Sequence, residues 1–188
     1  MTEMTNLFSQ GTSRTQNEKS LYRSEFERDS CGIGFVANIK GHRSNSIIKD
    51  ALLMVECMEH RGGKGCELET GDGAGIRVQI PYEFFVDVAP KSGFELKEAP
   101  EQFGVGLIYF PQDEATRKIY KLRIRDYVAA RGFEIIGYRV VPVNTSFAGK
   151  TSLKISPWIE QLFVRYKEKF EDSIFLERKL FVLRKYLT

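Results

Sequence analysis

The chain has 188 residues, of which 42% are hydrophobic, 28% charged and 12% aromatic, and these proportions exclude a fully disordered, fibrous or collagen-like protein. The length suits about one domain. The 28 basic and 25 acidic residues leave a net charge of +3, which gives no sign of a dedicated nucleic-acid binder. No apolar run approaches the roughly 18 residues that a membrane span needs. The odd count of 3 cysteines favours reduced thiols in the cytoplasm over a disulfide framework.

Residues 1–30 form a polar segment that we expect to lie apart from the folded domain. The stretch from Ser9 to Ser20 cannot bury enough apolar surface to offset its ordering entropy. The segment lacks the apolar region of a secretory signal, and its acidic residues outnumber its basic ones, which disfavours an organelle-targeting peptide. It is interpreted as a loose tail or as a segment that is removed later.

The first predicted elements are a strand and a helix. Residues 31–39 read as a buried strand, and Gly32 and Gly34 would let another backbone or a ligand approach it closely. Good N-cap residues at 44–46 precede apolar residues at helical spacing over 47–58. This helix is expected to end near His60, with Gly62 as a left-handed stop.

The rest of the chain continues to alternate between strands and helices. The pattern predicts a strand at 76–80, a helical turn at 81–85 and a surface connection over 87–101. A strand at 103–110, a helix from Asp113 to a stop at Gly132 and a strand at 133–143 follow. The last predicted elements are a strand at 159–166 and a helix over 172–186. An α+β sandwich with strands packed face to face and helices outside fits this order as well as a parallel sheet does.

Cys31 is the strongest candidate for chemistry because it stands where the polar segment meets the first predicted strand. The ordinary role of such a cysteine is that of a small buried hydrophobe. If the chain were cut between Ser30 and Cys31, the new α-amine would have an unperturbed pKa of about 8 and could accept the thiol proton. Nucleophile and base would then share one residue, as in N-terminal threonine nucleophiles, and the thiolate could attack an amide carbonyl.

A glycine-rich segment follows the first predicted helix. His60-Arg61 precede it, and six glycines fall among the fourteen positions from Gly62 to Gly75. A flexible surface loop, a phosphate cradle and a loop beside a site are all open interpretations. The phosphate cradle is disfavoured because no Gly-Lys-Ser/Thr step occurs and because Gly71–Gly75 precedes a predicted strand. No metal site is predicted, since the histidines have no ligand-like spacing with the cysteines.

In combination these motifs resemble a known family. The segments Cys31-Gly-Ile-Gly-Phe, His60-Arg61-Gly62, Thr70-Gly-Asp-Gly-Ala-Gly75 and Gln79-Ile-Pro-Tyr-Glu-Phe-Phe85 occur in this order. They are similar to the start of glutamate synthase large subunits, which is a class II glutamine amidotransferase domain of the N-terminal-nucleophile hydrolase type. Residues 175–185 resemble a helix of the same family, so the resemblance runs from about Arg23 to the end of the chain.

The resemblance implies an α+β fold that is part of a four-layer αββα sandwich, and it assigns roles to individual residues. Cys31 matches the nucleophile, with its own α-amine as base after cleavage, and residues 1–30 match a propeptide that is removed autocatalytically. Arg61 and Gly62 match a pair that lies beside the nucleophile and supports it. The implied reaction is hydrolysis of L-glutamine to glutamate and ammonia, which then aminates 2-oxoglutarate.

The resemblance also implies cofactors and partners for the complete protein. FMN and an iron–sulfur cluster are expected in the synthase domain, with no cofactor or metal in this segment. Electrons would come from ferredoxin, or from a reduced nicotinamide through a small subunit. Neither a nucleic acid nor a membrane is an expected partner, and the expected location is the cytoplasm, or a plastid in a plant or alga.

Some features depart from the family pattern. Cys66-Glu67 stand where a small residue followed by Asp is usual, so Glu67 keeps the charge on a longer side chain. Cys66 and Cys57 are interpreted as structural thiols. The family's oxyanion-hole Asn-Gly and its glutamine-binding residues are expected beyond Thr188, so residues 31–188 are interpreted as the N-terminal portion of an apparently truncated domain. A catalytically incomplete structural piece and an anion-binding module that uses the glycine loop are the alternatives.

Overall fold

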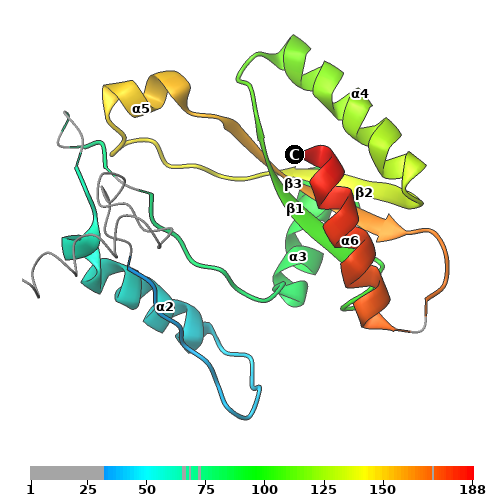
Figure 1. Ribbon diagram of the computed structural model, residues 1–188, viewed down its shortest axis with the longest axis horizontal. Helices are drawn as coiled ribbons and strands as arrows, with labels where there is room; N and C mark the ends of the chain where they lie inside the picture. The colour runs from blue at the N-terminus through cyan, green and yellow to red at the C-terminus, as the bar shows by residue number, and fades with distance from the viewer. Residues whose placement is uncertain (1–31, 65–66, 68, 72, 171) are drawn as a thin grey trace, which may run out of the picture. The chain divides into compact units, whose positions relative to one another are not determined.

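The computed structural model describes residues 32–64, 67, 69–71, 73–170 and 172–188, whose elements are labelled in Figure 1. The chain divides into two compact units. Unit 1 comprises Met1–Gly65 and Gly71–Gly75, and unit 2 comprises Cys66–Thr70 and Ile76–Thr188. The expected propeptide (1–30), Cys31 and Cys66 lie outside the described residues.

Unit 1 contains the predicted first helix. Helix α2 spans Asn45–Cys57, and the Ser44 Oγ atom accepts a hydrogen bond of 3.1 Å from the Ser46 backbone N–H. Such an N-cap satisfies one of the backbone donors that the first helical turn leaves unpaired. The helix prediction is therefore confirmed, with its cap. None of the residues of α2 is buried.

The predicted end of this helix is wrong in one respect. A 3-10 turn, η2 (Glu59–Arg61), follows α2, and Gly62 then adopts an extended backbone with φ of −88° and ψ of 146°. Gly62 is therefore not a left-handed stop. The Gly62 N–H donates to the Glu59 carbonyl at 3.0 Å, so the 3-10 turn already supplies the partner that a left-handed cap would have supplied.

The predicted strand at 31–39 is also not formed in the described residues 32–39. The side chains of Ile33, Phe35 and Ile39 are 97%, 91% and 102% exposed. A strand needs a neighbouring strand for its hydrogen bonds, and no strand is assigned in the part of unit 1 that the structure describes. Gly34 does allow a close approach, but what it admits is the Met54 side chain of α2, not a backbone or a ligand.

Unit 2 is built on a three-stranded antiparallel sheet. Its strands are β1 (Phe103–Phe110), β2 (Phe133–Val140) and β3 (Trp158–Tyr166), in the order β1-β3-β2. The three predicted strands are confirmed, although β2 ends three residues earlier than predicted. The α+β class is confirmed and the parallel alternative is wrong, because β1 and β2 both run antiparallel to the central β3.

Local sequence signals set most of the helices of unit 2. The helices and turns are α3 (Tyr82–Val88), η3 (Pro90–Ser92), α4 (Glu114–Ala130), α5 (Lys150–Ile155) and α6 (Ser173–Leu187). Asp113 and Asp172 cap α4 and α6 through their side chains. Gly132 stops α4 with a φ of 80°, as predicted. The short helix α5 was not predicted.

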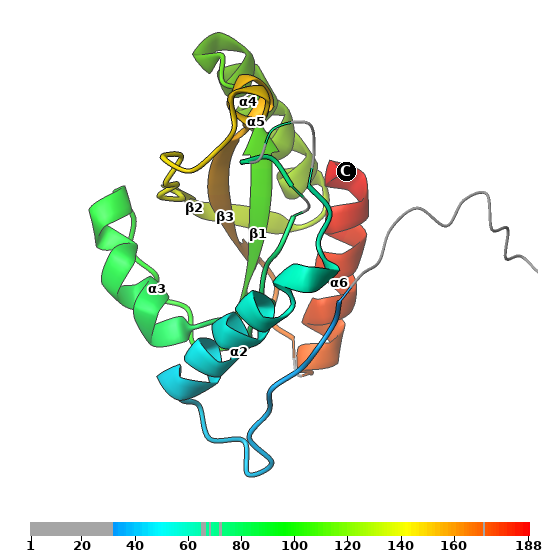
Figure 2. The same ribbon diagram turned by 90° about the vertical axis from the view of Figure 1, so that its left-hand side faces the viewer.

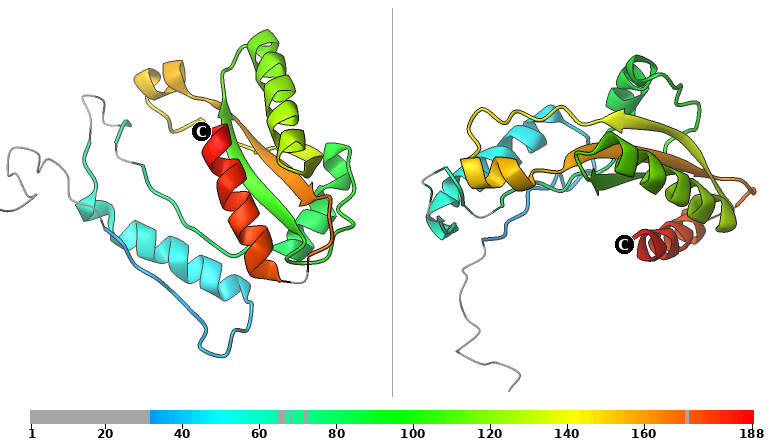
Figure 3. Two further views of the ribbon diagram at one scale, coloured as in Figure 1. Left: turned by 45° about the vertical axis from the view of Figure 1, so that its right-hand side comes forward. Right: turned by 90° about the horizontal axis from the view of Figure 1, so that it is seen from above.

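Hydrophobic clusters on both faces of the sheet form the core of unit 2. Helices α4 and α6 cover one face, while α3 lies against the other, as Figures 2 and 3 show. The first cluster contains Val128, Phe133, Leu162, Val164, Leu176 and Leu183. The second cluster contains Phe85, Ala89, Leu96, Phe103 and Phe163.

Two predicted features around α3 need correction. The segment 87–101 is more than a surface connection, because Ala89 and Leu96 are buried in the second cluster. The predicted strand at 76–80 is not formed, and Ile76, Val78 and Ile80 are exposed. The alternation of apolar residues predicted a strand, but a strand also needs a neighbouring strand for its hydrogen bonds. In the described parts of the chain, no helix has the length and apolar character needed to cross a membrane.

Candidate functional site

In unit 1, two described stretches of the glycine-rich segment meet. Lys64 and Gly71 pair in an isolated antiparallel bridge at the base of the loop. A Cβ atom on Gly71 would lie 2.9 Å from the Gly63 carbonyl oxygen, so only glycine fits this base without a shift. Arg61, at the end of η2, and Gly62 lie directly before the base. The pair expected to support the nucleophile therefore directly precedes this bridge in the chain.

The described glycines of this segment do not have the backbone of a phosphate cradle. Such a nest alternates right-handed and left-handed residues so that successive N–H groups converge. None of the described glycines of the loop has a positive φ. The described residues from Gly73 to Ile80 have no assigned helix, so no helix begins directly after Gly71. These observations disfavour the anion-binding alternative.

In unit 2, the side chain of Glu67 accepts two hydrogen bonds. Its Oε2 atom accepts hydrogen bonds of 3.0 Å from the Thr151 backbone N–H and of 3.0 Å from the Thr70 hydroxyl. The Thr70 Oγ1 atom also lies 3.4 Å from the Ser152 Oγ atom. The Thr151 N–H, and then the Thr70 and Thr151 side chains, lower the pKa of Glu67, which keeps the carboxylate ionised.

Gly149 gives this cluster its close packing. A Cβ atom on Gly149 would lie 2.6 Å from the Glu67 Oε2 atom and would overlap the Thr70 hydroxyl. Glycine at this buried position therefore lets the two side chains reach the first turn of α5. Sequence reasoning left open whether Glu67 makes a fixed contact, and the structure supplies one. The sequence did not reveal that Thr151 and Ser152 are the partners of Glu67 and Thr70, because they lie more than 80 positions further along the chain, in a helix that was not predicted.

A second polar cluster is buried between α4 and the sheet. Glu160 is only 3% exposed, and its Oε1 atom accepts a 2.7 Å hydrogen bond from the Trp158 indole N–H. The Lys121 ammonium lies 2.6 Å from the Oε2 atom and 4.4 Å from the centre of the Tyr138 ring. A buried carboxylate requires such a partner. The cluster contains none of the residues expected to take part in catalysis.

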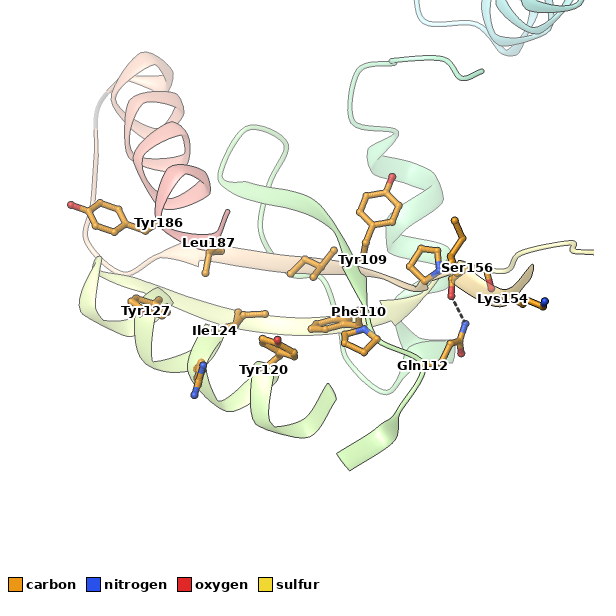
Figure 4. A pocket seen from close by; sticks show the side chains of 15 residues that line it. Tyr109, Phe110, Gln112, Tyr120, Ile124, Tyr127, Lys154, Ser156, Tyr186 and Leu187 are labelled. Carbon is orange, nitrogen blue, oxygen red and sulfur yellow. Dashed lines mark hydrogen bonds between the residues drawn. The ribbon is translucent and has the colours of Figure 1, made fainter. Parts of the chain in front are cut away.

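An open pocket of about 730 Å³ lies where the end of β1 meets α4, α6 and the segment after α5 (Figure 4). Its lining is rich in aromatic side chains, with Tyr109, Tyr120, Tyr127 and Tyr186 among them. None of the residues expected from the sequence to be catalytic lines it. The pocket gives no support to a catalytic role in unit 2.

The remaining candidate ligands stand apart from one another. In the described ranges, no group of three or more His, Cys, Asp or Glu side chains could hold a metal ion. The His60 Nδ1 atom lies 3.0 Å from the Cys57 carbonyl oxygen, which ties it to the end of α2. Cys57, interpreted from the sequence as a structural thiol, is exposed on α2.

Comparison with known proteins identifies relatives for most of the chain. Residues 31–188 match the family model "Glutamine amidotransferases class-II". The chain is 40% identical over 167 residues to "Glutamate synthase [NADPH] large chain" of Bacillus subtilis, covering 89% of this chain and 11% of that protein. It is 41% identical over 160 residues to "Ferredoxin-dependent glutamate synthase, chloroplastic" of Oryza sativa, covering 85% of this chain and 10% of that protein. The chain thus spans about a tenth of the length of these curated relatives.

Proposed function

This chain belongs to the class II glutamine amidotransferases, and from that membership we propose that it is the glutaminase part of a glutamate synthase, with Cys31 as its nucleophile. Its substrate is L-glutamine and its products are glutamate and ammonia. One observation carries the proposal. The match to the family model begins at Cys31, the residue at which the polar segment ends and at which a cleaved chain would expose a free α-amine.

The mechanism needs cleavage between Ser30 and Cys31 as its first step. The free α-amine of Cys31 then takes the thiol proton, and the thiolate attacks the side-chain amide carbon of glutamine. The tetrahedral intermediate breaks its C–N bond as the protonated amine returns a proton to the departing ammonia. Water hydrolyses the resulting thioester, which releases glutamate and restores the thiol. Arg61 and Gly62, before the base of the glycine loop, support the nucleophile in this sequence of steps.

The ammonia is used in a synthase domain of the same protein, where it aminates 2-oxoglutarate. The names of the relatives point to NADPH for the Bacillus protein and to ferredoxin for the rice protein. For this protein a donor of one of these two kinds is proposed, together with FMN and an iron–sulfur cluster in the synthase domain. A cytoplasmic location is proposed.

We further place the sheet of unit 2 in one layer of a four-layer αββα sandwich. Two features support this placement. Strand β1 is at an edge of the sheet, and the Leu107 and Tyr109 side chains on it are 54% and 63% exposed. Large apolar side chains on a sheet are normally covered by another layer. Residues 1–30 are proposed as the propeptide and residues 31–188 as the first portion of the amidotransferase domain.

The alternative is that this chain has a structural role and no catalytic activity. An experiment on the complete protein, purified from its native source, distinguishes this alternative from the proposal. Mass spectrometry should find a mature amino terminus at Cys31. Cys31→Ala should retain residues 1–30 and lose glutamine-dependent activity by at least about 10³-fold, because the nucleophile is gone. Ammonia-dependent synthesis should remain, since the nucleophile only generates ammonia.

Cys57→Ala is the matched control, because it removes another thiol that is exposed on α2. It should leave cleavage and both activities unchanged. Retention of Met1 in the wild-type protein, together with resistance of Cys31 to alkylating glutamine analogues, would contradict the proposal and favour the structural piece. Equal loss of both activities in Cys31→Ala would contradict the division of labour between the two domains.

A further inference from the structure

We propose that the free edge of strand β1 and the pocket beside it form a docking site for an extended segment of a partner protein, one that carries acidic and bulky apolar side chains. The edge supplies main-chain hydrogen bonds, and the pocket receives alternate side chains of the added strand. The site lies wholly within unit 2 and goes beyond the proposed function, because it involves neither Cys31 nor glutamine.

The two edges of the sheet differ in how they are protected. Strand β2, at one edge, has a register shift between Ile135 and Gly137 and carries Glu134 and Arg139. Such irregularities and charges are means by which edge strands resist pairing with another chain. Strand β1, at the other edge, pairs with β3 in unbroken register along its 8 residues and contains no charged residue and no proline. Strand β1 therefore lacks the protection that β2 has.

The outer side of β1 still has backbone groups to offer. A strand in a sheet has N–H and C=O groups on both sides, and an edge strand uses only one side. In the part of the chain that the structure describes, no backbone hydrogen bond joins β1 to any segment other than β3. Leu107 and Tyr109 on this strand are exposed. Among the described residues, nothing competes with an added strand for this edge.

The pocket adjoins the same edge. Residues 108–110 of β1 line one part of it, and Tyr120, Ile124 and Tyr127 of α4 line another (Figure 4). The Tyr120 and Tyr127 side chains are 43% and 49% exposed. Tyrosine is enriched at protein interfaces, where its ring supplies apolar contact area and its hydroxyl a polar tip. Because side chains alternate along a strand, every second residue of a strand added to β1 faces this pocket.

The charges at the pocket favour an acidic occupant. Arg123 of α4 and Lys154 of α5 line it, and no Asp or Glu is found among the described residues that do. Neither cation forms an ion pair within the described ranges, whereas the nearby Lys121 is paired with Glu160 at 2.6 Å. Complementary charge governs which partner such a surface selects. An acidic segment supplies the two cations with the partners that they lack.

The test uses the complete protein, purified from its native source, and a fluorescein-labelled peptide in which Glu alternates with Leu over the 8 residues of β1. Fluorescence anisotropy should show saturable binding that weakens as the salt concentration rises. A peptide with Lys in place of Glu should not bind. Along an extended peptide the N–H groups of alternate residues point to opposite sides. Of two peptides N-methylated at either alternate set, only one should therefore lose binding.

Variants of the protein test the edge and the pocket separately. Leu107→Lys places a charge on the open edge and should weaken binding at least about tenfold. Val140→Lys is its control, because it places the same charge at a position on β2 that is 50% exposed. Arg123→Glu should also weaken binding at least about tenfold. Arg125→Glu makes the same change of charge on α4 at a residue that does not line the pocket, and it should have little effect.

Several results would overturn the proposal. Equal binding of the Glu and Lys peptides would refute the acidic occupant, and equal binding of the two N-methylated peptides would refute pairing with β1. Failure of the wild-type protein to bind, with slow hydrogen exchange along β1 before any peptide is added, would show that the complete protein already covers this edge. Displacement of the peptide by single-stranded DNA, with both N-methylated forms bound alike, would assign the pocket to a nucleic acid instead.

Discussion

The two units of this chain contain similar sequence patterns but differ in what those patterns become. In unit 1, helix α2 forms with its cap, while the described residues 32–39 of the predicted strand form no strand and leave Ile33, Phe35 and Ile39 exposed. In unit 2, three predicted strands pair into a sheet and carry helices on both faces. All buried hydrophobic side chains among the described residues belong to unit 2.

The difference follows from where each element finds its hydrogen-bond partners. A helix bonds its N–H groups to carbonyl groups four residues back, so α2 can form without a core. A strand bonds only to another strand. Residues 32–39 and 76–80 have strand patterns and no partner in the described structure, whereas β3 has a neighbour on each side. A strand pattern therefore becomes a strand only where the rest of the fold supplies a neighbouring strand.

The largest expected change in the free energy of unfolding comes from a substitution in the core of unit 2. Phe163→Ala empties a fully buried position on β3, where the ring packs edge-on against Phe85 at 5.0 Å, and should lower the free energy of unfolding by about 3–5 kcal/mol. Phe147→Ala removes the same side chain from a position that is 83% exposed and should change the free energy of unfolding little. Denaturant titration measures both.

Amide hydrogen exchange in α2 tests whether unit 1 responds to the loss of the core of unit 2. Because α2 has no buried residue, its amides should be unaffected by Phe163→Ala. If protection of α2 fell together with that of the sheet, the two units would unfold as one, contrary to this expectation.

An intermediate effect is expected from removing a helix cap in each unit. Asp113 accepts the Thr116 N–H at 2.6 Å, and the helix that it caps, α4, packs on the sheet. Asp113→Ala should therefore cost unit 2 about 1 kcal/mol of unfolding free energy. Ser44→Ala removes the equivalent bond from α2 and should leave the denaturation midpoint of unit 2 unchanged, with faster exchange confined to the first turn of α2. If Ser44→Ala lowered the denaturation midpoint of unit 2 as much as Asp113→Ala does, the stability of unit 2 would depend equally on both caps, which would contradict this prediction.

The smallest effect on stability is expected from Tyr138→Phe. The Tyr138 hydroxyl is buried and has no hydrogen-bond partner among the described residues, so its removal should change the free energy of unfolding by less than about 1 kcal/mol, and toward a gain. Burial, and then the negative charge of Glu160, raise the pKa of Tyr138 to about 12 from an ordinary value of 10.0.

This raised pKa gives a pH dependence with a defined sign. Between pH 10 and about 12 the unfolded chain has already lost the proton that folded Tyr138 still holds, so stability falls as the pH rises through this window. Near-ultraviolet absorbance of tyrosinate should show one late titration that Tyr138→Phe removes and that Tyr109→Phe, at an exposed position, does not. Persistence of the late step in Tyr138→Phe would assign it to another tyrosine.

Prediction from the sequence succeeded where the signal was local. The caps Ser44, Asp113 and Asp172 begin helices, and Gly132 ends one, because each acts on backbone groups within a few residues. The order of the motifs from Cys31 to Gly75 indicated the family, which the match over residues 31–188 confirms. The roles of Cys31, Arg61 and Gly62 stay predictions.

The sequence by itself thus determined the three paired strands and the helices α4 and α6 of unit 2, and its resemblance to a known family indicated the family and the α+β class. Only the tertiary structure decided that β3 is central, that Gly62 is extended, and that Glu67 reaches Thr151 across 84 positions. The physical reason is the range of the interactions. Helix caps and periodicity are fixed by neighbours in the chain, whereas strand order and long-range acceptors depend on which distant segments the packed core brings together.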